Sequence, residues 1–308
     1  MLPQTGFERL PLTQAALDQA ASSPIKACPL SRGQEAEALD FLAAEPLRNV
    51  YMLGIIRDNG LVSPLNRGTF YACRDEAGQI EGVALIGHVT QLDVRTERAM
   101  KSFASAAQTC PSVHVVMGES KSVSEFWRHY SAGGQELRVA CRELLLEQQL
   151  PIEACGAAPR LRQATTADLP QILRVQAAMA VAECGVNPLT GDPEGFRARC
   201  VRRIERGRIW VLVEGGKLLF KADIMAETPE AIYIEGVYVN RRYRQRGHGR
   251  RCLLELGQIL LSRSKSVCLL VNERNLVAQS FYNSVGYKLR GLYDTIYLYK
   301  EKQLSQDD

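Results

Sequence analysis

The sequence lacks the long apolar runs that membrane insertion requires, since no stretch approaches the roughly 20 consecutive apolar residues of a membrane helix. Residues 1–23 have no apolar run behind a basic start, so a secretory signal is not expected. The chain also has little excess charge, with 38 Lys and Arg against 34 Asp and Glu. A net charge of +4 predicts no strong attraction to nucleic acid or to a membrane surface. We therefore expect a cytoplasmic protein in which any basic function is local.

Three further absences narrow the chemistry. The nine cysteines are odd in number and never form a Cys-x-x-Cys pair, which argues against a disulfide framework or a zinc site. The four histidines show no ligand spacing, so no metal is expected. No Gly-x-Ser-x-Gly turn accompanies the serines, which argues against a serine hydrolase. What is present is ordinary for a globular protein, with 46% hydrophobic and 23% charged residues.

The length of 308 residues suggests two domains, because about 150 residues is a usual domain size. Residues 148–159 contain Pro and Gly and no hydrophobic period, as expected of a connection. The predicted division is a flexible N-terminus at 1–24, a first domain at 25–150, a linker at 151–158 and a second domain at 159–308.

Helical and strand-like patterns alternate in both halves, which predicts an α/β fold with a mixed sheet. In the first half, residues 34–59 read as a helical stretch, and several strands and two further helices follow it. In the second half, Asp192 and Pro193 are typical of a helix start, and Gly215-Gly216 is typical of a hairpin turn.

The most specific segment runs from Ile234 to Arg251, where a strand enters a glycine-containing turn and then an apolar-periodic helix. Such a turn presents backbone N–H groups and a helix N-terminus to an anion. Gly247 and Gly249 allow the backbone to approach a ligand closely, and nearby arginines supply positive charge. A solvated basic loop is the alternative, but the glycine spacing favours a pyrophosphate site.

The strand before this turn predicts a bulge. Ile232 and Ile234 alternate regularly, but the next apolar pair is Val237 and Val239, so the period of two slips at Gly236. A slip at a glycine is typical of a β-bulge, which leaves N–H groups available to a ligand.

Two motifs resemble those of the GNAT superfamily of acyl-CoA-dependent N-acyltransferases. The segment Arg244-Gln-Arg-Gly-His-Gly249 is similar to its R/Q-x-x-G-x-G/A signature, and residues 275–287 are similar to its N-x-x-A-x-x-x-Y-x-x-x-G-F/Y helix. The resemblance implies acetyl-CoA or another acyl-CoA as cosubstrate. It further implies pyrophosphate contacts from Arg244, Gln245, Arg246, Gly247, His248, Gly249 and Arg250, and pantetheine contacts from Val237, Tyr238 and Val239. Asn275 would contact the CoA arm, and Tyr282 would lie at the thioester sulfur.

The resemblance covers the second half. The first half has a similar order of elements, but after its central strands it reads His88-Val-Thr-Gln-Leu-Asp-Val-Arg-Thr-Glu, with no glycine in the turn. It resembles a degenerate copy, as in tandem GNAT proteins, which implies a structural or substrate-shaping role. We therefore expect two GNAT-like domains, of which the second carries the acyl-CoA site.

Acyl transfer to an amine needs a neutral nucleophile, so a base is useful. Glu235 is the candidate because it lies just before the predicted bulge, although it could equally be the charge partner of a nearby arginine. Tyr282 is the candidate acid, with a packed aromatic as its alternative reading. No feature of the sequence identifies the acceptor, which could be a small molecule or a peptide amine. Two other functions are possible from the sequence. One is a non-catalytic acyl-CoA sensor, and the other is a nucleic-acid-binding module, which the low net charge disfavours.

Overall fold

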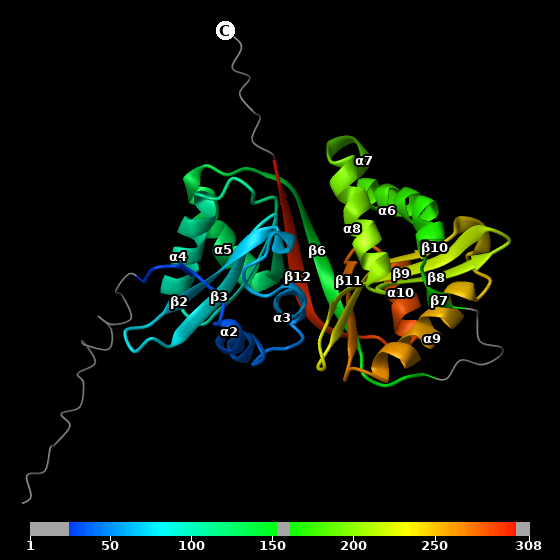
Figure 1. The fold of residues 1–308 in the computed structure, drawn as a ribbon, viewed down its shortest axis with the longest axis horizontal. Coiled ribbons are helices and arrows are strands. Elements are labelled where there is room, and N and C mark those ends of the chain that lie inside the picture. Colours follow the sequence, from blue (N-terminus) through cyan, green and yellow to red (C-terminus); the bar gives the residue numbers. More distant parts are fainter. Residues whose placement is uncertain (1–24, 153–160, 300–308) are drawn as a thin grey trace, which may run out of the picture.

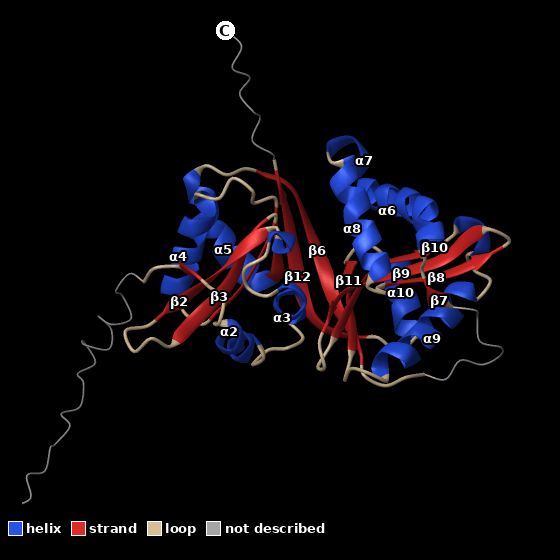
Figure 2. Ribbon diagram, viewed as in Figure 1, coloured by secondary structure: helices blue, strands red, loops and turns tan. Residues whose placement is uncertain are grey.

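The computed structural model describes residues 25–152 and 161–299. The predicted flexible segment 1–24 and most of the predicted linker 151–158 lie outside these residues. The described residues form a twelve-stranded mixed sheet. Helices pack against this sheet (Figure 1, Figure 2). The predicted α/β fold is therefore confirmed. No helix within the described ranges has the length and apolar character to cross a bilayer.

The first half begins with an edge strand and ends with a long strand in the centre of the sheet. Its strands are β1 (Cys28–Pro29), β2 (Gly68–Arg74), β3 (Ile80–Gly87), β4 (Val89–Val94), β5 (Val115–Glu119) and β6 (Leu137–Gln148). Its helices are α2 (Glu35–Leu42), α3 (Val50–Asn59), α4 (Glu97–Gln108) and α5 (Ser120–Tyr130), with short 3-10 turns η1 (Pro64–Asn66) and η2 (Ser131–Gly133). The helical stretch predicted at 34–59 is thus two helices, because Pro46 lies between them and cannot donate a helical hydrogen bond.

The second half repeats this order. Its strands are β7 (Arg162–Gln163), β8 (Ile209–Glu214), β9 (Lys217–Glu227), β10 (Ile232–Val239), β11 (Val267–Asn272) and β12 (Lys288–Leu298). Its helices are α6 (Leu169–Cys184), α7 (Pro188–Gly191), α8 (Pro193–Glu205), α9 (His248–Leu261) and α10 (Leu276–Ser284), with 3-10 turns η3 (Thr166–Asp168) and η4 (Arg241–Tyr243).

Two local predictions in this half are confirmed. The Asp192 side chain caps α8 by accepting a hydrogen bond from the Gly195 N–H. Gly215 and Gly216 join β8 to β9, and both have positive φ, as a two-residue type I′ hairpin turn requires.

The two halves exchange their last strands. The sheet order is β1-β2-β3-β4-β5-β12-β6-β11-β10-β9-β8-β7, so β6 pairs with β11 and β12 pairs with β5, both antiparallel. In Figure 1 the long strands β6 and β12 lie side by side in the centre of the molecule. Each half therefore completes the sheet of the other, and the halves of the chain are not two separate sheets.

Each half opens between its two parallel strands. β10 pairs with β11 only at Ile232 and Tyr233, and β4 pairs with β5 only at Val89 and Thr90. Beyond Tyr233, β10 forms no ladder with β11, and within the described residues its edge on that side is unpaired. This leaves a stretch of strand backbone for other partners.

The halves also meet through α3, which packs against β9. A Cβ atom added at Gly54 would lie 2.6 Å from the Cβ of Ala226, so only glycine permits this approach. Nearby, Arg208 at the start of β8 forms an ion pair with Asp58 of α3. These contacts bring α3 to the edge of the cavity described below.

Candidate functional site

The predicted bulge in β10 is present. The pairing of β10 with β9 shifts between Glu235, opposite Asp223, and Tyr238, opposite Lys221. Gly236 has a φ of +61°, and a Cβ there would lie 2.9 Å from the Lys221 ammonium nitrogen. The positive φ favours glycine at this position, where a side chain would also displace the Lys221 ammonium group.

The end of β10 leads to an uncapped helix N-terminus. Gly247 precedes α9 with a φ of +77°, and no side chain caps the helix. A Cβ added at Gly247 would meet no atom within 4 Å, so the space in front of the helix is open. Gly249 is also required for packing, because a Cβ there would lie 2.8 Å from the Val239 side chain. It lets α9 pack closely on β10.

Positive charge surrounds this helix end. Five exposed arginines lie in or next to the turn, namely Arg241, Arg242, Arg244, Arg246 and Arg250. Within the described residues, none of them has a carboxylate within 4.0 Å. Arg244 donates from Nε to the Val239 carbonyl at 3.0 Å, and the Arg246 guanidinium lies 6.0 Å from the Tyr243 ring centre. Unbalanced positive charge and free helical N–H groups together suit an anion.

The turn contains two further residues singled out by the resemblance. Gln245 has a φ of +59°, which is uncommon for a residue other than glycine. The His248 ring lies edge-on to the Tyr243 ring, with 6.0 Å between centres.

The corresponding junction in the first half is closed. The Thr96 hydroxyl caps α4 by accepting from the Ala99 N–H, and Glu97 places a negative charge in the first helical turn. A helix end that is capped by its own side chain and carries a carboxylate does not attract a second anion. The first half thus lacks the glycine-containing turn, and its helix α4 begins with a side-chain cap where α9 has none.

The second motif has its asparagine at a helix cap. The Asn275 side chain accepts from the Ala278 N–H at 3.1 Å and so begins α10. Tyr282 of the same helix is buried, with its ring 5.8 Å from that of Tyr287. Burial, and secondarily the charge of Glu183, raises the pKa of Tyr282, so its phenol stays protonated at neutral pH.

Glu235 lines a cavity of about 350 Å³ and remains accessible to solvent. The protein around the carboxyl removes part of its hydration and so raises its pKa, and the charges of Asp223 and Glu143 act in the same direction against Arg203 and Lys221. Among the described residues, no cation lies within 4.0 Å of this carboxylate. The neighbouring arginine, Arg203, is instead paired with Asp223 at 3.3 Å. Glu235 is therefore not the ion-pair partner of Arg203, which was the alternative interpretation of this residue.

A second carboxyl influences this region. Partial loss of hydration, and secondarily the charges of Glu235 and Glu143, raise the pKa of Glu183, near the end of α6, to about 7. A carboxyl with such a pKa exchanges protons near neutral pH. In the sequence, Glu183 has no feature that separates it from other helical glutamates.

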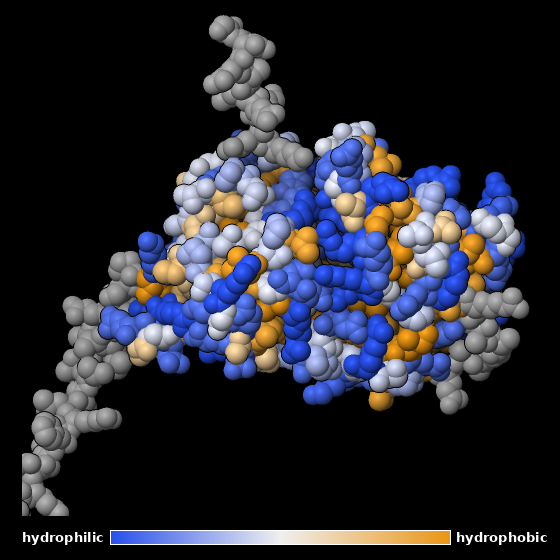
Figure 3. Space-filling view, in the orientation of Figure 1, coloured by the Kyte–Doolittle hydropathy of each residue, from blue (hydrophilic) through white to orange (hydrophobic). Residues whose placement is uncertain are grey.

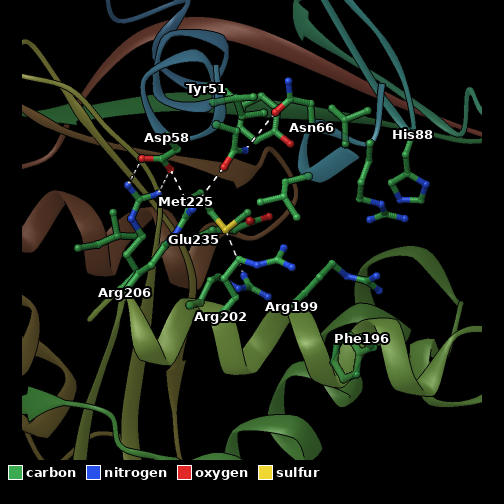
Figure 4. A pocket seen from close by; sticks show the side chains of 18 of the residues that line it. Tyr51, Asp58, Asn66, His88, Phe196, Arg199, Arg202, Arg206, Met225 and Glu235 are labelled. Carbon is green, nitrogen blue, oxygen red and sulfur yellow. Dashed lines mark hydrogen bonds and ion pairs between the residues drawn. The ribbon is translucent and has the colours of Figure 1, made fainter. Parts of the chain in front are cut away.

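The cavity lies between the two halves (Figure 4). Tyr51 of α3, Asn66 of η1 and His88 line it from the first half, while α8 lines it from the second. Arg199 and Arg202 point from α8 toward the first half in Figure 4. Figure 3 shows hydrophilic side chains gathered where the halves meet. The sequence did not reveal this cavity, because neither half forms it alone.

Comparison with known proteins relates the second half of the chain to one family. Residues 205–289 match the acetyltransferase (GNAT) domain family. A comparison with curated proteins finds no match. Among solved structures, a GNAT-family acetyltransferase from Colwellia psychrerythraea is 12% identical, with a TM-score of 0.57 over 90% of this chain and 100% of that one.

Two other solved structures have a similar fold. A GCN5-related N-acetyltransferase from Sphaerobacter thermophilus is 14% identical, with a TM-score of 0.57 over 88% of this chain and 94% of that one. A tandem GNAT protein from the clavulanic acid biosynthesis pathway is 15% identical, with a TM-score of 0.55 over 88% of this chain and 98% of that one. Residues 205–289 thus match the GNAT domain family, and the chain as a whole shares the fold of these solved GNAT proteins.

Proposed function

We propose that the protein is an N-acyltransferase that moves an acyl group, with acetyl as the first candidate, from acyl-CoA to an amine. One observation supports this above all: the bulged strand β10, open toward β11, ends at the uncapped and arginine-rich N-terminus of α9. An extended ligand with an amide-containing arm and a pyrophosphate fits such a strand edge and helix end. Coenzyme A has both parts.

In this proposal, the CoA pyrophosphate binds the N–H groups at Gly247 to Gly249, with Arg244 and Arg246 beside it. The pantetheine arm lies along Val237 to Val239, on the edge of β10 that β11 leaves free. The thioester then lies near the bulge, next to Glu235. Backbone N–H groups in this stretch stabilise the oxyanion that forms during attack.

The reaction needs no covalent intermediate on the protein. The amine nitrogen attacks the thioester carbonyl carbon, so that a C–N bond forms and the C–S bond breaks. An alkylammonium with a pKa of ~10.4 must first lose a proton, which costs about 4.6 kcal/mol at pH 7. Glu235 takes this proton, directly or through water, and its raised pKa makes it a stronger base. Tyr282 gives a proton to the departing thiolate, which yields free CoA.

The first half, in this proposal, is a degenerate GNAT-like copy that binds no acyl-CoA of its own. The capped and acidic N-terminus of α4 supports this division. Its roles are to supply β6 to the sheet of the second half and to form one wall of the cavity beside Glu235.

An acceptor screen tests the proposal. Purified protein with acetyl-CoA, and then with longer acyl-CoAs, is expected to release free thiol only when a suitable amine is present. Mass spectrometry should find the acylated amine. Tight acyl-CoA binding with no thiol release across the screen would instead favour a sensor.

A further inference from the structure

The cavity beside Glu235 has an unusual balance of charge. Six arginines line it, namely Arg67, Arg199, Arg202, Arg203, Arg206 and Arg208. Only two carboxylates do so, Asp58 and Glu235. Since the whole chain has a net charge of only +4, this concentration of arginine is local.

Four of these arginines have partners. Arg206 and Arg208 both pair with Asp58, and Arg203 pairs with the buried Asp223. Arg199 pairs with Asp192, whose side chain is 55% exposed.

Arg67 and Arg202 differ from the other four. Neither has a carboxylate within 4.0 Å among the residues the structure describes. They come from opposite walls, Arg67 from the turn after η1 in the first half and Arg202 from α8 in the second. Asp192 acts on the charge of Arg67 only from beyond this distance, so neither guanidinium has an ion-pair partner among the described residues of the cavity wall.

The backbone of Arg67 is fixed at the wall of the cavity. Its backbone has a φ of +54°, a conformation that is uncommon outside glycine, and its carbonyl accepts from the His88 N–H at 2.9 Å. Loss of hydration and the like charge of Arg199 lower the pKa of Arg67, and the charges of Tyr51 and Asp192 act in the opposite direction. Guanidinium groups from two halves of a protein that repel one another are stabilised by an anion between them.

The size of the cavity indicates what kind of anion fits. A volume of about 350 Å³ is in the range of small-molecule sites, roughly 300–1,000 Å³. Glu235 lines the same cavity, so one small molecule is able to present an amine to Glu235 and an anionic group to the arginines.

We infer that the acceptor is a small primary amine that carries a carboxylate or phosphate group, and that Arg67 and Arg202 bind this group. The inference rests on the proposed acyl transfer, to which it adds the class of acceptor. Carboxylate and phosphate share the chemistry that guanidinium recognises, which is a pair of oxygens able to accept parallel hydrogen bonds. Polyamines are disfavoured by repulsion from the same groups.

Matched pairs of amines test the inference in acetyl transfer. O-phosphoethanolamine is compared with ethanolamine, and β-alanine with β-alaninamide, because each pair differs only in the anionic group. We expect kcat/KM to be at least about tenfold higher for the anionic member of one pair, which also distinguishes phosphate from carboxylate. Spermidine serves as the cationic probe and is expected to be used poorly.

The variants Arg67→Gln and Arg202→Gln are each expected to raise KM for the preferred anionic amine about tenfold, with a smaller change in kcat. KM for acetyl-CoA should not change. Arg197→Gln is the matched control, since Arg197 is exposed on the same helix as Arg202 and does not line the cavity. It should leave both KM values as in the wild type.

A binding measurement separates this inference from the proposed function. When excess CoA occupies the proposed site at the N-terminus of α9, the preferred anionic amine should raise the melting temperature of the wild type but not of Arg202→Gln. If the anionic amine stabilises the wild type in this way but no acyl transfer occurs, the proposed reaction is wrong and the assignment of the anion site still holds. Transfer to neutral amines as efficiently as to anionic ones, or variants with wild-type KM, would overturn the inference and keep the reaction. Absence of both binding and transfer for every probe would also overturn the inference.

Discussion

Arg208 donates hydrogen bonds to both carboxylate oxygens of Asp58, at 2.5 and 2.7 Å, although 150 positions separate the two residues in the chain. This pair connects α3 of the first half to the start of β8 in the second. Arg206 adds a third contact to the same carboxylate at 3.4 Å. Asp58 therefore links the two walls of the cavity.

Replacing Asp58 by Asn should lower the free energy of unfolding by about 1–3 kcal/mol, because partly buried guanidinium groups lose their charged partner. Chemical denaturation measures this. Glu97→Gln is the control, since Glu97 is exposed and its ion pair with Lys101 is of the i,i+4 type. It should cost no more than about 0.5 kcal/mol. Equal losses for the two variants would show that the Asp58 contact does not hold the halves together.

A fragment of residues 159–308 should not fold stably. It lacks β6, the strand that pairs with both β11 and β12. Without β6, both β11 and β12 would expose unpaired edges, which favours aggregation. Size-exclusion chromatography and circular dichroism of the fragment measure this. A folded, monomeric fragment that binds CoA would contradict the role given to the exchanged strands.

The sequence predicted features that depend on neighbouring residues. The slip of hydrophobic period at Gly236 marked the bulge, and the capping residue Asp192 marked the start of α8. Such signals act over a few residues and are visible in the chain itself.

The strand exchange and the cavity were not predictable in this way. The pattern of Leu137–Gln148 identifies a strand but does not say which strand it pairs with. Arg199 and Arg202 read as the solvated face of a helix, and only the packing of the first half against α8 makes them part of a cavity wall. Contacts between distant segments leave no local pattern.

Glu235→Gln should reduce turnover by about 10²-fold or more at neutral pH and less as the pH approaches the pKa of the amine. A base must be deprotonated, so wild-type turnover should rise as the pH passes upward through the raised pKa of Glu235. The variant should lack this rise. Initial rates at saturating acetyl-CoA, measured across pH, test this. If Glu183→Gln abolishes the rise and Glu235→Gln does not, the base is Glu183, whose pKa is about 7.

Tyr282→Phe should lower kcat about tenfold or less and leave the acetyl-CoA affinity unchanged, because a thiolate leaves without full protonation. Tyr287→Phe is a matched control, since its ring is fully buried beside Tyr282 and its hydroxyl has no hydrogen-bond partner within the described residues. It should leave kcat unchanged. Equal kcat losses in the two variants would point to packing, and no loss in Tyr282→Phe would exclude the acid role.

The central claim is that the turn before α9 binds acyl-CoA, and calorimetric titration of acetyl-CoA into Gly247→Asp tests it most directly. Aspartate tolerates the left-handed backbone at this position and places a negative charge in the open space where the pyrophosphate would lie. Gly216→Asp is the matched control, because Gly216 has a similar φ of +70° and equally open surroundings in the β8–β9 turn. We predict loss of acetyl-CoA binding in Gly247→Asp and wild-type affinity in Gly216→Asp. Wild-type affinity in a folded Gly247→Asp protein would contradict the account.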